Sequence, residues 1–85
     1  MQYFPVFLNL TDRRVLVIGD GEAAERKAGA LRRAGGLVST AAHFGPDDHA
    51  LLDDCALVIG ADAPEAELAA LSAAAQARGI PVNIV

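Results

Sequence analysis

The feature that most constrains the fold is a glycine turn between an apolar run and a helical pattern. Residues 15–18 read Val-Leu-Val-Ile, and the turn that follows, residues 19–24, reads Gly-Asp-Gly-Glu-Ala-Ala, a G-x-G-x-x-A spacing. From residue 24 to residue 34 apolar positions recur at helical spacing, and Gly35-Gly36 is typical of a helix C-terminus. The chain therefore contains a buried strand, a tight turn and a helix that packs back on the strand.

The glycine spacing also predicts a phosphate site. In turns of this kind the first glycine makes the bend, the second lets the backbone approach a pyrophosphate, and a small third residue lets helix and strand pack closely. The N–H groups at the start of the helix then face the phosphates, where the helix dipole favours negative charge. A turn of small residues also occurs purely for packing, but the strand before it and the helix after it favour nucleotide binding.

The rest of the chain repeats the alternation of strand and helix. Predicted strands cover residues 37–42, 56–59 and 80–85, a short helix covers 46–54, and Asp62 is the predicted N-cap of a longer helix that Gly79 ends. Residues 1–13 form an N-terminal arm. This order predicts one α/β domain over residues 1–85, a small Rossmann-like open parallel sheet of about four strands with helices on both faces.

Two details of the pattern bear on the cofactor and the packing. Many nicotinamide-binding folds place a carboxylate at the end of the second strand to bind the ribose. Here residues 39–44 read Ser-Thr-Ala-Ala-His-Phe, with no carboxylate before Asp47 and no arginine nearby in the sequence. A hydroxyl or backbone group would have to bind the ribose, and a 2′-phosphorylated cofactor is disfavoured. Gly29, inside the first helix, suggests close packing against a neighbouring element, for which the sheet is one candidate.

Composition narrows the function classes. A net charge of −4 argues against nucleic acid or an acidic membrane surface as a partner, and no apolar run approaches a membrane span. The single Cys55 excludes an internal disulfide and a cysteine-based zinc cluster, and the spacing of His43 and His49 matches no common metal pattern, so no metal site is predicted. Without a recognisable signal peptide we expect a cytoplasmic protein. Much of the apolar 53% is alanine, so the core is thin and a partner domain or second subunit is expected.

Beyond these patterns, the chain resembles a known family over nearly its whole length. The matching segments are Phe4-Pro5-Val6-Phe7 with Leu10, residues 15–27 including Arg26-Lys27, residues 52–55, residues 57–59 and residues 81–85. They resemble the N-terminal domain of siroheme synthase, in the precorrin-2 dehydrogenase/sirohydrochlorin ferrochelatase family. Arg26-Lys27 directly after the glycine turn is the feature that generic dinucleotide folds seldom show.

The resemblance implies NAD as the cofactor and oxidation of precorrin-2 to sirohydrochlorin, followed in that family by ferrous iron insertion. It also implies a homodimer, a tetrapyrrole substrate for the full-length protein, and frequent fusion to a uroporphyrinogen-III C-methyltransferase. The cofactor-binding residues carried over by position are Gly19, Gly21, Glu22 and Ala23 on the pyrophosphate with Asp20 in the same turn, His43 and Phe44 against the adenosine half, and Asn83 near the nicotinamide end.

Three departures from the family keep a second interpretation open. The family usually carries a further segment after the second strand, and its alanine-threonine after the third core strand is here Ala61-Asp62. Its catalytic aspartate would follow Val85, so the catalytic residue is unknown here, and we expect a cofactor-binding fragment that is inactive alone. The alternative is a non-catalytic nucleotide-sensing or dimerisation module with a degenerate dinucleotide fold. Asp20 bears on this choice, because its side chain would repel phosphate if it pointed inward.

Overall fold

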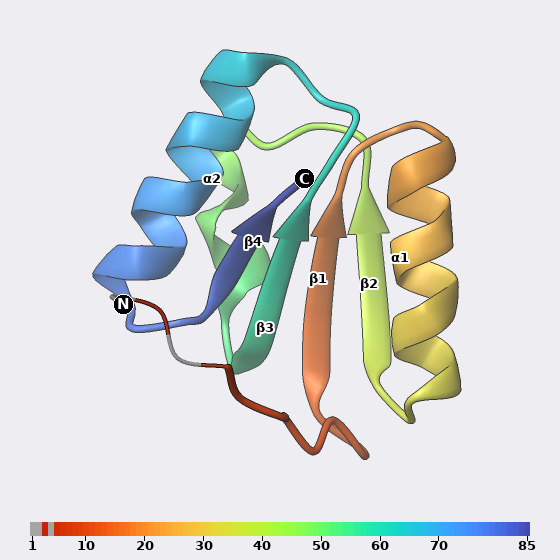
Figure 1. Ribbon diagram of the computed structural model, residues 1–85. Helices are drawn as coiled ribbons and strands as arrows, with labels where there is room; N and C mark the ends of the chain where they lie inside the picture. Colours follow the sequence, from red (N-terminus) through yellow and green to blue (C-terminus); the bar gives the residue numbers. More distant parts are fainter. Residues whose placement is uncertain (1–2, 4) are drawn as a thin grey trace.

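The computed structural model describes residue 3 and residues 5–85 as a four-stranded sheet with three helical segments (Figure 1). Met1, Gln2 and Phe4 lie outside the described residues, and with them part of the predicted arm and of the first matching segment. The elements in chain order are β1 (Arg14–Ile18), α1 (Glu22–Arg33), β2 (Leu37–Ala41), the 3-10 helix η1 (Pro46–Leu52), β3 (Cys55–Gly60), α2 (Glu65–Ala77) and β4 (Val82–Ile84). All strand pairs are parallel, so the predicted small Rossmann-like fold is confirmed.

Side chains that alternate along the central strands build a core layer on each face of the sheet. Leu16 and Val58 belong to the layer under α2 and η1, which also contains Ile18, Phe44, Leu52, Leu71 and Ala75. Val17 and Ile59 belong to the layer under α1, with Ala24, Ala28 and Ala61. The predicted covering of both faces is thus confirmed, and it explains why residues 15–18 are apolar without alternation.

The strand order β2-β1-β3-β4 places a topological switch point between β1 and β3. From β1 the chain passes to β2 on one side and then returns across β1 to β3 on the other. In open α/β sheets, ligands bind outside the carboxyl ends of the strands at this point. The turn after β1 and the turn after β3 meet there, because the Ala61 N–H donates to the Ile18 carbonyl at 2.9 Å and the Asp20 N–H donates to the Asp62 carbonyl at 3.2 Å.

Two local predictions are wrong. The N-cap of α2 is Pro64, with φ −56° and ψ 140°, and no side chain caps this helix. Asp62, the predicted cap, has a left-handed backbone with φ +55°, and its carboxylate bonds to another helix. Gly29 is half-buried, and a Cβ there would meet only the flexible Nη1 end of Arg33, at 3.3 Å, so it marks no close approach to the sheet.

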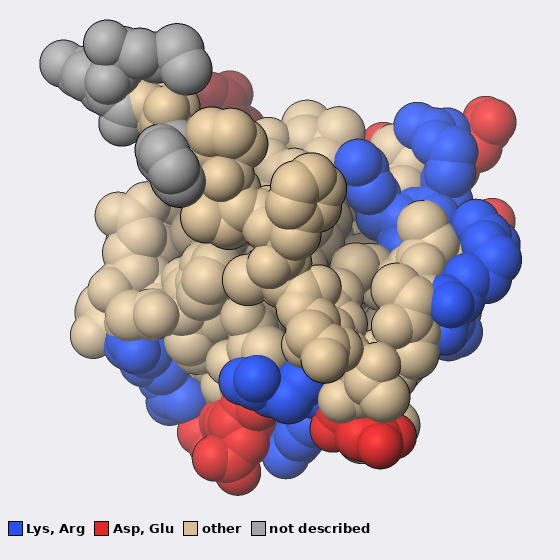
Figure 2. Space-filling view, turned by 60° about the horizontal axis from the view of Figure 1, so that its bottom comes forward, with Lys and Arg blue, Asp and Glu red and all other residues tan. Residues whose placement is uncertain are grey.

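The N-terminal arm contributes one residue to the core. Leu10 is buried, whereas Tyr3, Val6, Phe7 and Leu8 are largely exposed. Figure 2 turns the amino ends of the strands toward the viewer and shows uncharged residues over the middle of this face, with charged side chains mainly toward its rim. Apolar side chains of the described part of the arm are therefore exposed to solvent.

Candidate functional site

The first glycine of the turn holds together the ends of three strands. Gly19 has φ +145°, a conformation open to glycine but strained for other residues, and its N–H donates to the Ala41 carbonyl at the end of β2 at 2.8 Å. A Cβ built on Gly19 would lie 1.5 Å from the Ala61 carbonyl oxygen at the end of β3. Because any side chain would collide with that backbone, glycine is required here.

The second glycine meets a side chain rather than backbone. Gly21 is the N-cap of α1, and its φ of −169° and ψ of −174° are open to any residue. A Cβ on Gly21 would, however, lie 2.7 Å from both Cγ and Oδ2 of Asp62. The space that the missing side chain leaves is therefore bordered by a carboxylate.

The same carboxylate caps the first turn of α1. Asp62 Oδ2 accepts a hydrogen bond of 2.9 Å from the Ala24 N–H, 38 residues earlier in the chain. Within residue 3 and residues 5–85, the other first-turn N–H groups, those of Gly21, Glu22 and Ala23, have no acceptor. These three groups are the donors that remain for an anion at the start of α1.

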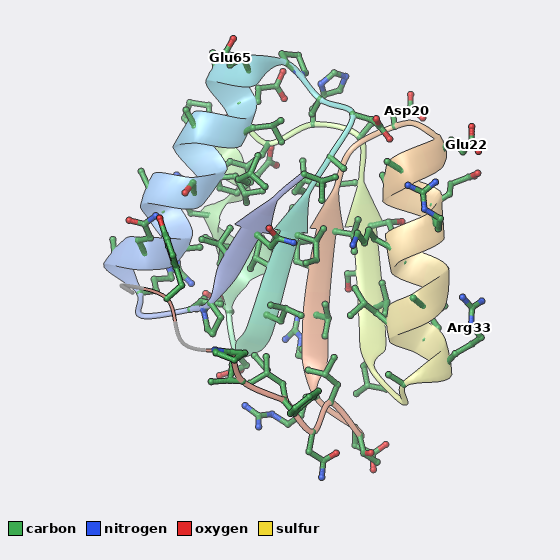
Figure 3. All side chains as sticks on the ribbon, viewed as in Figure 1. Asp20, Glu22, Arg33 and Glu65 are labelled. Carbon is green, nitrogen blue, oxygen red and sulfur yellow. The ribbon has the colours of Figure 1, made fainter. Side chains whose placement is uncertain are left out.

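A cavity of about 540 Å³ opens beside this turn, between α1 and the carboxyl end of β2. It is lined by Val17, Gly19, Asp20, Gly21, Ala24, Glu25, Ala28, Arg32, Thr40, Ala41 and Ala42. Three of the predicted cofactor-binding residues, Gly19, Asp20 and Gly21, thus share a cavity with a hydroxyl residue, Thr40. Asp20 and Glu22 lie on the rim above the turn, and both are exposed (Figure 3).

Sequence reasoning missed Arg32. No arginine is close in sequence to residues 39–44, yet Arg32 lines the same cavity as Thr40. Ala24, Ala28 and Arg32 stand at i, i+4 and i+8, so they share one helix face. That spacing is the signal that could have placed this cation beside the end of β2.

Two further predicted residues line a second cavity, of about 510 Å³, between α2 and η1. His43 Nδ1 lies 3.1 Å from Glu67 Oε1, and the same oxygen accepts the Phe44 N–H at 2.9 Å. The Phe44 ring is buried in the core layer under α2, with its centroid 5.3 Å from that of His49. His43 and Phe44 therefore line a different cavity from the glycine turn, and both contact Glu67 of α2.

Asn83 is exposed on the edge strand β4, in register with Ile59 of β3. Glu22 and Ala23 lie in the first turn of α1. The binding roles given to these three residues, and to His43 and Phe44, stay predictions. Among residue 3 and residues 5–85, no group of three histidine, cysteine or acidic residues could hold a metal ion.

Cys55 begins β3 and is half-buried. Its Sγ donates to the Leu51 carbonyl oxygen at 3.3 Å. Burial raises the pKa of the thiol, and the nearby carboxylates of Asp53 and Asp54 act in the same direction, whereas the Arg14 guanidinium opposes them. A thiol held in its neutral form is a weak nucleophile, which favours a structural over a reactive role for Cys55. No helix in the described part of the chain is long and apolar enough to cross a membrane.

A family model described as "Putative NAD(P)-binding" matches residues 6–85. The chain belongs to this NAD(P)-binding family. It is also similar to siroheme synthases. That of Thiobacillus denitrificans is 42% identical over 104 residues, and the match covers 99% of this chain and 21% of that protein. That of Ectopseudomonas mendocina is 43% identical over 101 residues, covering 100% of this chain and 22% of that protein. That of Nitrosomonas eutropha is 40% identical over 107 residues, with 100% and 22% covered.

These matches confirm the family predicted from the matching sequence segments. The chain spans about a fifth of the length of the siroheme synthases it matches. The alignments are longer than the 85 residues of the chain, so the relatives carry residues that face gaps here, in keeping with the shortened sequence noted above.

Proposed function

We propose that the chain is the NAD-binding domain of a siroheme-biosynthesis enzyme that oxidises precorrin-2 to sirohydrochlorin. The observation that carries the proposal is the glycine turn at the switch point between β1 and β3, with free N–H groups at the start of α1. The proposal is also supported by the similarity of the whole chain to siroheme synthases.

The donor set fits a dinucleotide. The N–H groups of Gly21, Glu22 and Ala23 would bind the pyrophosphate, and the cavity beside Thr40 would take the adenosine ribose. We propose NAD, because the end of β2 offers hydroxyl and backbone groups rather than a built 2′-phosphate site. Arg32 also lines this cavity, so NADP⁺ is the comparison that tests the choice.

The nicotinamide supplies the hydride acceptor for the oxidation. This chain's share of the work is to bind and orient the cofactor, with Asn83 proposed near the nicotinamide end. We further propose a tetrapyrrole substrate and a homodimer for the complete protein. The exposed apolar side chains of Tyr3, Val6 and Phe7 support a second protein surface against the arm.

A non-catalytic nucleotide-sensing or dimerisation module is the second candidate. One observation favours it: the Asp62 carboxylate already satisfies a donor at the start of α1, as expected of a helix end that needs no ligand. The first candidate takes part in precorrin-2 oxidation and the second does not. A domain kept only for dimerisation would also bind no dinucleotide.

The test is a calorimetric titration of the 85-residue chain with NAD⁺, NADH and NADP⁺, repeated on Gly21→Val. We expect saturable NAD⁺ binding that the valine abolishes, because its Cβ would enter the space beside the first-turn donors. Ala30→Val is the matched control, since Ala30 is exposed on the same helix and does not line the cavity. Circular dichroism checks that each variant is folded. Absence of binding by the folded parent chain would refute the cofactor role.

Oxidation is tested in a chimera, because the chain spans only part of its relatives. This chain replaces the matching segment of the Thiobacillus denitrificans siroheme synthase, and NADH formation is followed with precorrin-2 as substrate. Turnover by the chimera that Gly21→Val abolishes would support the dehydrogenase role. A folded chimera that binds NAD⁺ without oxidising precorrin-2 would favour the sensing module.

A further inference from the structure

The Asp62 carboxylate lies beside the N–H groups proposed to bind the cofactor's phosphates. Its Oδ2 accepts the Ala24 N–H at 2.9 Å, and the carboxylate lies 2.7 Å from the position that a Gly21 side chain would take. In a G-x-G-x-x-A turn, the missing side chain of the second glycine is what lets a pyrophosphate approach the backbone. In this chain that approach is filled by an anionic group of the chain itself.

The backbone holds Asp62 in this orientation. Its left-handed conformation, with φ +55°, is one that aspartate and asparagine tolerate better than most residues. Its carbonyl oxygen accepts the Asp20 N–H at 3.2 Å, which joins the turn after β3 to the turn after β1. Because β1 and β3 are neighbours in the sheet, the carboxylate meets α1 rather than the helix that follows it.

A carboxylate and a diphosphate cannot share this position. Both are anions that use N–H groups at the start of α1 and the positive end of its dipole. Asp20 and Glu22, both exposed on the same rim, add negative charge around the turn. Asp62 is itself exposed, so its side chain has solvent to move into.

We propose that Asp62 sets the affinity of this dinucleotide site: its carboxylate occupies the anion position at the start of α1, and a diphosphate binds only when that side chain swings out. This inference rests on the proposed NAD-binding function. It identifies an internal competitor for the cofactor, contributed by the loop after β3.

The sharpest test is Asp62→Asn. Asparagine keeps the size of the side chain, tolerates the left-handed backbone and retains an oxygen that can accept the Ala24 N–H, but it removes the charge. Asp12→Asn is the matched control, because Asp12 is also exposed, also has φ of +59°, and lies before β1 at the opposite end of the sheet. Each chain is titrated calorimetrically with NAD⁺ at one ionic strength.

We expect Asp62→Asn to bind NAD⁺ about tenfold more tightly than the parent chain, a difference of 1.4 kcal/mol, while Asp12→Asn binds like the parent. Equal affinities for all three chains would overturn the role of Asp62 and leave the NAD-binding function standing. An equal gain in NAD⁺ affinity in both variants would also overturn the role of Asp62, since such a gain would reflect only the change in net charge. Absence of binding by all three would remove the proposed function, and this inference with it.

A second measurement needs only the parent chain, in case the asparagine variant does not fold. The amide resonance of Ala24 and the carboxyl carbon resonance of Asp62 are followed by NMR during titration with NAD⁺. Displacement of the carboxylate predicts that both resonances shift together and saturate with the binding curve. Saturated binding with the Asp62 resonance unmoved would overturn the proposal.

Discussion

Replacement of Gly19 by alanine tests the geometry on which the whole turn depends. Gly79 provides the comparison, since both glycines have positive φ, +145° and +70°. They differ in their surroundings: a Cβ on Gly79 would meet nothing within 4 Å, whereas a Cβ on Gly19 would lie 1.5 Å from the Ala61 carbonyl oxygen and 2.7 Å from its carbon. The pair therefore compares a glycine in open space with one that faces neighbouring backbone.

The expected free energies follow from these contacts. Gly79→Ala should cost about 1 kcal/mol, the strain of a left-handed alanine. Gly19→Ala adds a contact that must open from 1.5 Å to at least 3.0 Å. Such a movement breaks the bonds from Ala61 N–H to Ile18 O and from Gly19 N–H to Ala41 O. Each broken bond leaves polar groups unpaired at about 1–3 kcal/mol, so the two bonds and the strain together cost about 3–7 kcal/mol.

Urea denaturation followed by far-ultraviolet circular dichroism measures the difference, because the free energy of unfolding is read from the transition midpoint and slope. A domain of this size has about 4–13 kcal/mol of stability, so Gly19→Ala should lose a large part of it, whereas Gly79→Ala should lose little. If the two variants unfold at free energies within about 1 kcal/mol of each other, the Ala61 carbonyl does not crowd Gly19 and the reasoning fails.

Two other residues give independent predictions. Gly29→Ala should stabilise the chain by about 0.5–1 kcal/mol, because alanine favours the helix interior and its Cβ would meet only a movable arginine end, at 3.3 Å; a lowered melting temperature would show an unrecognised close contact. The Cys55 thiol should react with iodoacetamide more slowly in the folded chain than in the urea-unfolded chain at the same mildly alkaline pH, because burial raises its pKa. Because the unfolded chain releases the thiol proton at lower pH than the folded chain, the free energy of unfolding should fall as pH rises through the ordinary thiol pKa. Equal alkylation rates in the folded and unfolded states would contradict the raised pKa.

The fold was predictable because its signals are local. The unbroken apolar run from Val15 to Ile18, the glycine turn and the helix after it follow one another in sequence, and each agrees with the next. The same local reasoning failed for Asp62. An Asp-Ala-Pro-Glu segment predicts a cap for its own helix. Because β1 and β3 are adjacent in the sheet, however, the carboxylate bonds to the N–H of Ala24 in α1, 38 residues earlier.

The cavity residues show a similar limit. Gly19 and Gly21 are found by their spacing, since the turn they build is continuous in sequence. Arg32 and Thr40 share a cavity because α1 and β2 pack together, and no local sequence pattern predicts that contact. Phe44 comes three residues after the end of β2, and its ring is buried in the core layer under α2, because a large apolar side chain contributes more there than at a rim.

The position of β1 in the middle of the sheet also dictates an order of events during synthesis. When β1, α1 and β2 have left the ribosome, the face of β1 that carries Leu16 still lacks its cover, because Val58, Leu71 and Ala75 come much later in the chain. Contacts between residues far apart in sequence form slowly, and apolar strands that stay exposed during this time can aggregate with other chains. A nascent chain shorter than about 75 residues therefore lacks part of the core layer under α2, and folding is completed only when α2 emerges.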